Sequence, residues 1–292
     1  MTPRRLSLDD LHRIIPTFSA EMRNDAGGRT IGLANKVIAH FLGQDWFEAH
    51  IRHDADKQGY LTLDFSTDRR REATVFRVVE LAENLFNLQN IDGFDACIAQ
   101  MQGGGDLLES TCAELDVGRF LYIHDVNFRF VVPQKARGSD YDFEVMYDDG
   151  RIAPADAKCK LESTAIDPTT IRNSLEKARK QLPRDQAGII FMKVPQTWIE
   201  TIAMATEIVD VARGFMRNTG RIISIKFYVS HLQLSNEAVL HRHAYRELTN
   251  ESSRFYAGQK WDIFKDYPVP SSWNGMPSKW QRLFFFPYNP EE

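Results

Sequence analysis

The sequence predicts an α/β protein in which a mixed central sheet is flanked by helices and preceded by an all-α N-terminal region. Three observations support this fold class. Apolar residues recur at helical spacing from Ser7 to about Met101. Residues 126–132 then alternate as a half-buried strand does, and residues 188–194 form a continuous apolar run typical of a strand covered on both faces. The pattern therefore changes from helices alone to strands and helices in alternation.

Three regions are expected along the chain. The glycine tract at residues 103–105 cannot continue a helix without a cost in backbone entropy, so we place a boundary there. Residues 1–105 are predicted to form a helical N-terminal domain and residues 106–235 an α/β core. Residues 236–292 are predicted to be an aromatic-rich extension that packs on the core, and they include Trp261, Trp273 and Trp280.

Within residues 106–235 the pattern predicts a helix, three strands, a helix, a strand, a helix and a final strand. The first helix is expected to begin at Asp106, with Glu109 three positions on as in a capping box, and to end near His124. Pro168 is a typical residue for the first turn of the second helix. After the first helix, the elements are expected at residues 126–132, on both sides of a turn at residues 148–150, and at residues 168–182, 188–194, 196–217 and 222–229. The residues that follow are expected to be irregular.

Charge and cysteine content limit the protein class. The net charge is −4, which does not favour a generally basic nucleic-acid binder. The basic residues are unevenly placed, however, because residues 211–265 hold nine Lys and Arg against four Asp and Glu. Any surface for a polyanion is expected in that stretch or on residues 177–184. Three widely spaced cysteines without a Cys-x-x-Cys pair, and no signal-like or membrane-length apolar run, lead us to expect a soluble cytoplasmic protein with no membrane partner.

The strands on both sides of the predicted turn carry a group of reactive side chains. Asp142 begins the first strand, and the second strand places Asp156 and Lys158 two positions apart, on one face of the sheet. Two carboxylates and an ammonium can hold a divalent cation and orient a water beside it, as metal-assisted cleavage of a phosphodiester requires. The structural alternative is an exposed edge strand with alternating charges.

A third carboxylate is expected to face the same sheet. Glu114 lies on the helical stripe that contains Val117 and Leu121, three and seven positions further on. A charged carboxylate in apolar packing is costly without a partner, so a nearby cation is expected. The alternative is a salt bridge to Arg129.

This arrangement resembles the PD-(D/E)XK, or restriction-endonuclease-like, superfamily of nucleases over roughly residues 106–230. Glu114 is similar to the first-helix glutamate of that superfamily, Asp142 to its first aspartate, Asp156 to its second acid and Lys158 to its lysine. Tyr141 departs from the proline of the family name, and Asp140 leaves open which of the two aspartates, Asp140 or Asp142, contacts the metal.

The resemblance implies a restriction-endonuclease-like core and a Mg²⁺-dependent endonuclease, with Mn²⁺ as an alternative ion. Glu114, Asp142 and Asp156 would hold the metal, and Lys158 would hold or deprotonate the attacking water or stabilise charge on the phosphate. The expected partner is nucleic acid, DNA more than RNA, with a homodimer suited to duplex cleavage. The alternative is a catalytically silent module of the same fold that binds nucleic acid or a protein.

Further polar residues follow the predicted site. Lys160 shares the strand face of Asp156 and Lys158, and the helix after the hairpin places three polar side chains at helical spacing, with a glutamine that resembles a supporting glutamine in some relatives. The alternative for such a charged helix is a solvated face. The candidate substrate contacts are Lys160, Asn173, Lys177, Lys180 and Gln181.

Overall fold

The structure is a computed structural model of the 292-residue chain. It describes residues 3–51, 60–61, 67–103, 108–132, 134, 136–160, 164–165, 167–195, 198, 202–234, 239–257, 261, 263, 279–283 and 286–287. Predictions that concern Asp106, the glycines at 104 and 105, and Trp273 lie outside these residues.

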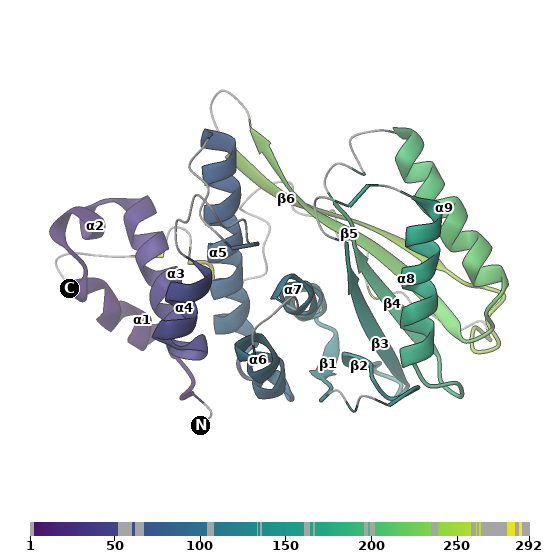
Figure 1. The fold of residues 1–292 in the computed structure, drawn as a ribbon. Helices are drawn as coiled ribbons and strands as arrows, with labels where there is room; N and C mark the ends of the chain where they lie inside the picture. Colours follow the sequence, from purple (N-terminus) through teal and green to yellow (C-terminus); the bar gives the residue numbers. More distant parts are fainter. Residues whose placement is uncertain are drawn as a thin grey trace.

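The N-terminal region is helical, as the sequence predicts (Figure 1). Its first helix begins with a capping box, in which the hydroxyl of Ser7 accepts from the backbone N–H of Asp10 and the Asp10 carboxylate accepts from that of Ser7. The elements are α1 (Leu8–Ile14), the 3₁₀ turn η1 (Ile15–Thr17), α2 (Ala20–Asn24), α3 (Ala26–Leu42), α4 (Gln44–His50), α5 (Asp68–Leu88) and α6 (Phe94–Gln102).

In the described part of the chain, six strands form one sheet in the order β1-β2-β3-β4-β5-β6. Strands β1, β2 and β3 are antiparallel, β3, β4 and β5 are parallel, and β6 returns antiparallel to β5, so the sheet is mixed as expected. The strands are β1 (Asn127–Phe130), β2 (Phe143–Met146), β3 (Ile152–Cys159), β4 (Gly188–Lys193), β5 (Ile222–Leu234) and β6 (Val239–Thr249).

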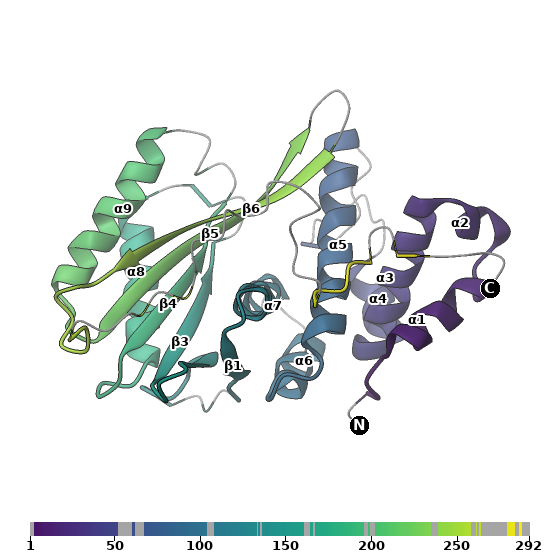
Figure 2. The ribbon, with the colours of Figure 1, turned by 180° about the vertical axis from the view of Figure 1, so that it is seen from behind.

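Helices cover both faces of this sheet (Figures 1 and 2). Small residues on β3, such as Ala153 and Ala155, let α7 (Leu108–Ile123) pack closely on one face. The opposite face packs under α8 (Pro168–Gln181) and α9 (Ile202–Arg217). Asp167 caps α8 by accepting from two backbone N–H groups of its first turn.

The turn between β2 and β3 confirms the prediction at residues 148–150. Gly150 has a φ of 86°, a left-handed conformation that favours glycine, and its N–H donates to the carbonyl of Tyr147 over 2.9 Å. Tyr147 in turn donates its backbone N–H to Arg151 over 2.9 Å, which closes the hairpin.

One strand was not predicted. The residues after the expected last strand were expected to be irregular, yet β6 pairs with β5 from Ser224↔Thr249 to Leu234↔Val239. The prediction is wrong for this segment because β6 carries His and Arg among its apolar residues, which hides the strand pattern, and its pairing with the long strand β5 stabilises it. The region predicted as a C-terminal extension thus begins with a strand of the main sheet.

The described C-terminal residues pack on two different surfaces. Trp261 is buried and lies 5.2 Å from the ring of Tyr147 at the β2–β3 hairpin. Trp280 and Leu283 instead donate to the buried carboxylate of Glu83 on α5, over 3.3 and 2.9 Å. The extension therefore contacts the helical region as well as the sheet.

The hydrophobic core is continuous across the predicted boundary at residue 105. One cluster of buried side chains includes Leu33 and Leu85 from the N-terminal helices together with Phe120 on α7 and Phe143 and Phe191 in the sheet. No helix in the described ranges combines the length and the apolarity that a bilayer-spanning segment requires.

Candidate active site

Asp142 lies where β2 separates from β3. The ladder between these strands ends at Phe143↔Ala155, and Asp142, one residue before β2, makes two other bonds to β3. Its backbone N–H donates to the carbonyl of Ala155 over 3.0 Å, and its Oδ2 accepts from the backbone N–H of Ala157 over 2.6 Å. The carboxylate of Asp142 therefore accepts the hydrogen bond that a backbone carbonyl of β2 would accept if the two strands continued to pair.

Asp156 and Lys158 form an ion pair at the same place. The side chain of Asp156 is 0% exposed, and its Oδ2 lies 2.5 Å from Nζ of Lys158, whose side chain is 16% exposed. This ammonium also donates to the carbonyl of Ala157 over 3.1 Å. The carboxyl of Asp142 is a second hydrogen-bonding neighbour of Asp156, and this contact lowers the pKa of Asp142. The exposed edge strand considered above is therefore wrong for Asp156.

Burial dominates the electrostatics of these two carboxyls. It raises the pKa of Asp156 well above its usual range, the charge of Asp142 raises it further, and the ammonium of Lys158 opposes the increase. Burial also raises the pKa of Asp142, against the lowering influence of Lys158 and of the Ala157 N–H. Both carboxyls thus favour taking up a proton or binding a cation.

Glu114 belongs to the same electrostatic group. It projects from α7 and is half-buried, and burial raises the pKa of its carboxyl well above the usual range, with further increases from the charges of Asp142 and Asp156. Arg129, the alternative partner, instead pairs with Glu144 at 2.6 Å. The alternative considered for Glu114, a salt bridge to Arg129, is therefore wrong, because Arg129 on β1 pairs with its cross-strand neighbour Glu144 on β2.

Gln181, at the end of α8, forms hydrogen bonds with the loop before Asp142. Its side-chain amide donates to the carbonyl of Asp140 over 2.8 Å and to Oδ2 of Asp140 over 3.4 Å. The backbone N–H of Asp140 also donates to the carbonyl of Gln181 over 3.4 Å. Of the two aspartates left open by the sequence, Asp142 is the one bonded to β3, whereas Asp140 is held by the end of α8.

The other predicted substrate contacts lie in different surroundings. Lys160 is half-buried next to the end of β4, where burial lowers the pKa of its ammonium and the charge of Lys177 lowers it further. Asn173, Lys177 and Lys180 are exposed on α8. The structure therefore places Lys160 and Lys177 within electrostatic range of each other, while Lys180 lines a separate cavity.

The fit to a metal ion rests on Asp142 and Asp156. Within the described ranges, no group of three or more His, Cys, Asp or Glu side chains is arranged to hold one ion, so Glu114 does not complete a three-ligand set in this arrangement. The buried oxygens of Asp156, beside the Asp142 carboxylate, still offer the hard oxygen donors that Mg²⁺ and Mn²⁺ prefer. One or two carboxylates suffice for Mg²⁺ when water and phosphate oxygens complete its coordination.

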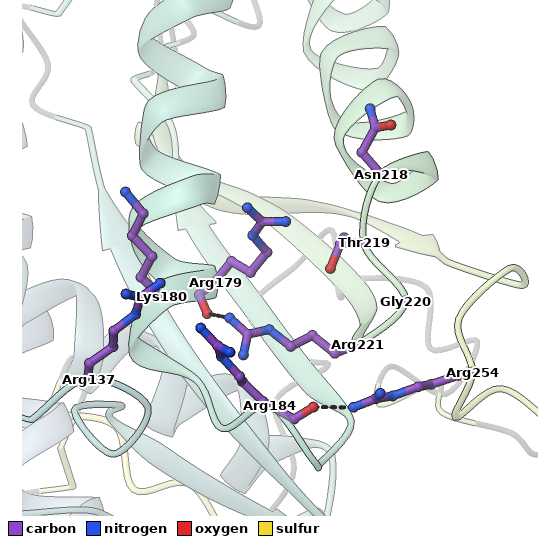
Figure 3. Close-up of a pocket in the computed structure, with 9 residues that line it drawn as sticks. All are labelled: Arg137, Arg179, Lys180, Arg184, Asn218, Thr219, Gly220, Arg221 and Arg254. Carbon is purple, nitrogen blue, oxygen red and sulfur yellow. Dashed lines mark hydrogen bonds between the residues drawn. The ribbon is translucent and has the colours of Figure 1, made fainter.

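Sequence reasoning did not single out four arginines that gather around Lys180. Arg137, Arg184, Arg221 and Arg254 line a cavity of about 420 Å³ together with Arg179 and Lys180 (Figure 3). The sequence did indicate this cavity in part, through the excess of basic residues in 211–265 and the basic segment 177–184. The fold brings members of both stretches together.

Comparisons with known proteins do not place the chain in a family. No protein-family pattern matches the sequence, and no curated protein matches it either. The fold and the side-chain geometry define an α/β protein with a six-stranded mixed sheet flanked by helices and a buried carboxylate–ammonium group at the point where the sheet opens.

Proposed function

We propose that the protein is a metal-dependent nuclease with a restriction-endonuclease-like, PD-(D/E)XK core, which hydrolyses phosphodiester bonds of nucleic acid, DNA in preference to RNA. The observation that carries the proposal is the fully buried carboxylate of Asp156, 2.5 Å from the ammonium of Lys158. Burying such a carboxylate is costly, and its cost is difficult to explain by stability alone. Strongly perturbed carboxyls beside a charged partner are typical of functional sites.

The roles of the residues follow from their positions. Asp142 and Asp156 would hold Mg²⁺ or Mn²⁺, and Glu114 is the third proposed ligand. When bound, the ion polarises a phosphate oxygen and lowers the pKa of a bound water. Lys158, held beside Asp156, donates hydrogen bonds to the attacking water or to phosphate oxygens on which negative charge develops. Asp142 also keeps β3 in position through the N–H of Ala157.

A second function is favoured by a specific observation. Among the described residues no three potential ligands are arranged around one ion, and the oxygen of Asp156 is already paired with Lys158. A catalytically silent module of this fold, which binds nucleic acid or a protein through its basic surface, is consistent with that arrangement. The two functions differ in whether any phosphodiester bond is cut.

The test is a cleavage assay on the full chain. Supercoiled plasmid, linear duplex, single-stranded DNA and RNA are incubated with Mg²⁺ or Mn²⁺, with and without chelator. We expect chelator-sensitive cutting of at least one substrate. Asp156→Asn and Lys158→Ala should each lower the rate by about 10²-fold or more, because each removes a group that acts on the reacting phosphate or water.

Matched controls separate chemistry from folding. Asp45 and Lys36 are exposed on α4 and α3, so Asp45→Asn and Lys36→Ala should cut at the rate of the unchanged protein. Thermal unfolding establishes that every variant is folded. Cutting that persists in Lys158→Ala would contradict the proposed nuclease, and binding of nucleic acid without any cutting would favour the silent module.

A further inference from the structure

A basic cavity lies at the end of the sheet where β4 and β5 begin. It has a volume of about 420 Å³, within the range of small-ligand pockets. Its basic lining comes from segments far apart in the sequence: the loop before β2, the end of α8, the loops leading into β4 and β5, and the turn after β6 (Figure 3). The six cationic side chains are Arg137, Arg179, Lys180, Arg184, Arg221 and Arg254.

Little negative charge offsets these six cations. The nine described lining residues include no Asp or Glu. Nearby acids include Glu176, which pairs with Arg179, Asp185, which lines an adjoining depression, and Asp140, which is bonded to Gln181. The cavity is therefore strongly positive in a chain whose net charge is −4.

Two of the guanidinium groups are held in place by backbone carbonyls. Arg221 donates to the carbonyl of Arg179, and Arg254 donates to that of Arg184, as the dashed lines in Figure 3 show. The backbone N–H of Arg254 also donates to the carbonyl of Gly220 over 3.0 Å. These bonds fix the orientation of cations that would otherwise separate.

The concentration of like charges has an electrostatic cost. Burial lowers the pKa of Arg221, and the charges of Arg179, Arg184, Arg137 and Arg254 lower it further. A bound anion with several negative charges would reverse this effect. Guanidinium groups match phosphate oxygens in shape, because each presents two parallel N–H donors.

We propose that this cavity binds a small ligand that carries two or more phosphate groups, such as a nucleoside triphosphate or inorganic triphosphate. We take a small ligand as the occupant because the cations line one concave site of about 420 Å³, a size that suits a small ligand. The inference does not depend on the proposed metal site, since none of the six cations is a proposed metal ligand or Lys158; Lys180 alone is also a candidate substrate contact of the proposed nuclease.

The test is calorimetric titration of the full chain with inorganic triphosphate, ATP, adenosine and a short single-stranded oligonucleotide. Chelator is present throughout, so that no ligand binds through a metal at the carboxylates. We expect triphosphate and ATP to bind and adenosine not to bind. Triphosphate should also raise the unfolding temperature, whereas sulfate at the same ionic strength should raise it much less.

Arg184→Gln provides the sharpest variant. No described residue forms a hydrogen bond or an ion pair with the exposed Arg184 side chain, so its loss should not destabilise the fold. We expect it to weaken triphosphate binding about tenfold, as loss of one charge-assisted contact implies. Arg213→Gln on α9 is the matched control, because Arg213 is exposed and lies outside the cavity.

Three results would overturn the proposal. The first is that triphosphate at millimolar concentration gives no heat and no shift in unfolding temperature. The second is that Arg184→Gln binds triphosphate as tightly as the unchanged chain does. The third is that the oligonucleotide binds more tightly than triphosphate and competes with it, which would assign the cavity to the backbone of a nucleic-acid strand.

Discussion

At the scale of single residues, Asp156 combines full burial with an ion pair to Lys158. A buried ion pair offers little net stability, because the desolvation of both charges offsets their attraction. Glu114 and Asp142 add further negative charge nearby, and each shifts the pKa of another carboxyl in the group. These residues therefore lower the stability of the fold in the absence of a cation, which is common where side chains serve a function.

The raised pKa values give stability a definite pH dependence. The carboxyl of Glu114 ionises near its usual value of about 4 in the unfolded chain but well above it in the folded chain. Between those two pKa values the folded chain binds more protons, so the free energy of unfolding falls as pH rises. In chelator, Glu114→Gln should therefore raise the free energy of unfolding by about 1 kcal/mol at pH 8 and leave it nearly unchanged at pH 4.

Urea unfolding at pH 4, 6 and 8 measures this difference. Glu48→Gln is the control, because Glu48 is exposed on α4 and its replacement should give a difference that does not grow with pH. A Glu114→Gln variant that is less stable than the unchanged chain at pH 8 would show that Glu114 has a stabilising partner in the fold.

At the scale of elements, Asn250 connects the end of β6 to the turn between α9 and β5. It is 5% exposed, and its side-chain amide lies within 3.2, 3.0 and 2.9 Å of the carbonyls of Met216, Thr219 and Ile222. Its backbone N–H donates to Ile223 over 2.8 Å. One side chain thus satisfies carbonyls at the end of a helix and at the start of a strand.

Asn250→Ala should lower the free energy of unfolding by about 2 kcal/mol, because it leaves buried carbonyls without donors. Asn218→Ala is the matched control on the same turn. The side chain of Asn218 is exposed, and in the described structure its amide donates to the carbonyl of Gly214 alone, over 2.9 Å, so its replacement should cost well under 1 kcal/mol. Equal losses in the two variants, measured by urea unfolding, would contradict this role for Asn250.

The elements also show what the sequence could and could not predict. The β2–β3 hairpin and the pairing of Asp156 with Lys158 depend on local patterns, a turn glycine and the two-residue period of a strand, and these are visible in the sequence. β6 depends on its pairing with β5. The partner of Arg129 and the gathering of Arg137 with Arg221 depend on contacts between distant segments, which periodicity does not encode.

At the scale of the whole molecule, one continuous segment connects the basic cavity to one of the carboxylates. Arg137 lines the cavity and Asp142 contacts β3 five residues later, so their Cα atoms are at most roughly 18 Å apart. Gln181 holds this segment at Asp140. A ligand in the cavity therefore contacts a loop that leads directly to the proposed metal ligand.

The continuous core gives the N-terminal helices a part in the same arrangement. Glu114 projects from α7, which packs between α5 and the sheet, so displacement of the N-terminal helices would move this carboxylate relative to Asp142. The helical region thus supports the position of Glu114 in the proposed site.

Calorimetric titration with Mn²⁺ at pH 7 tests the central claim most directly. We expect binding by the unchanged chain with release of protons, since the raised pKa values leave protons for the cation to displace. Asp156→Asn should abolish this binding, and Asp45→Asn should preserve it. Equal Mn²⁺ affinity in Asp156→Asn and the unchanged chain, or no binding by either, would contradict a cation site at Asp156.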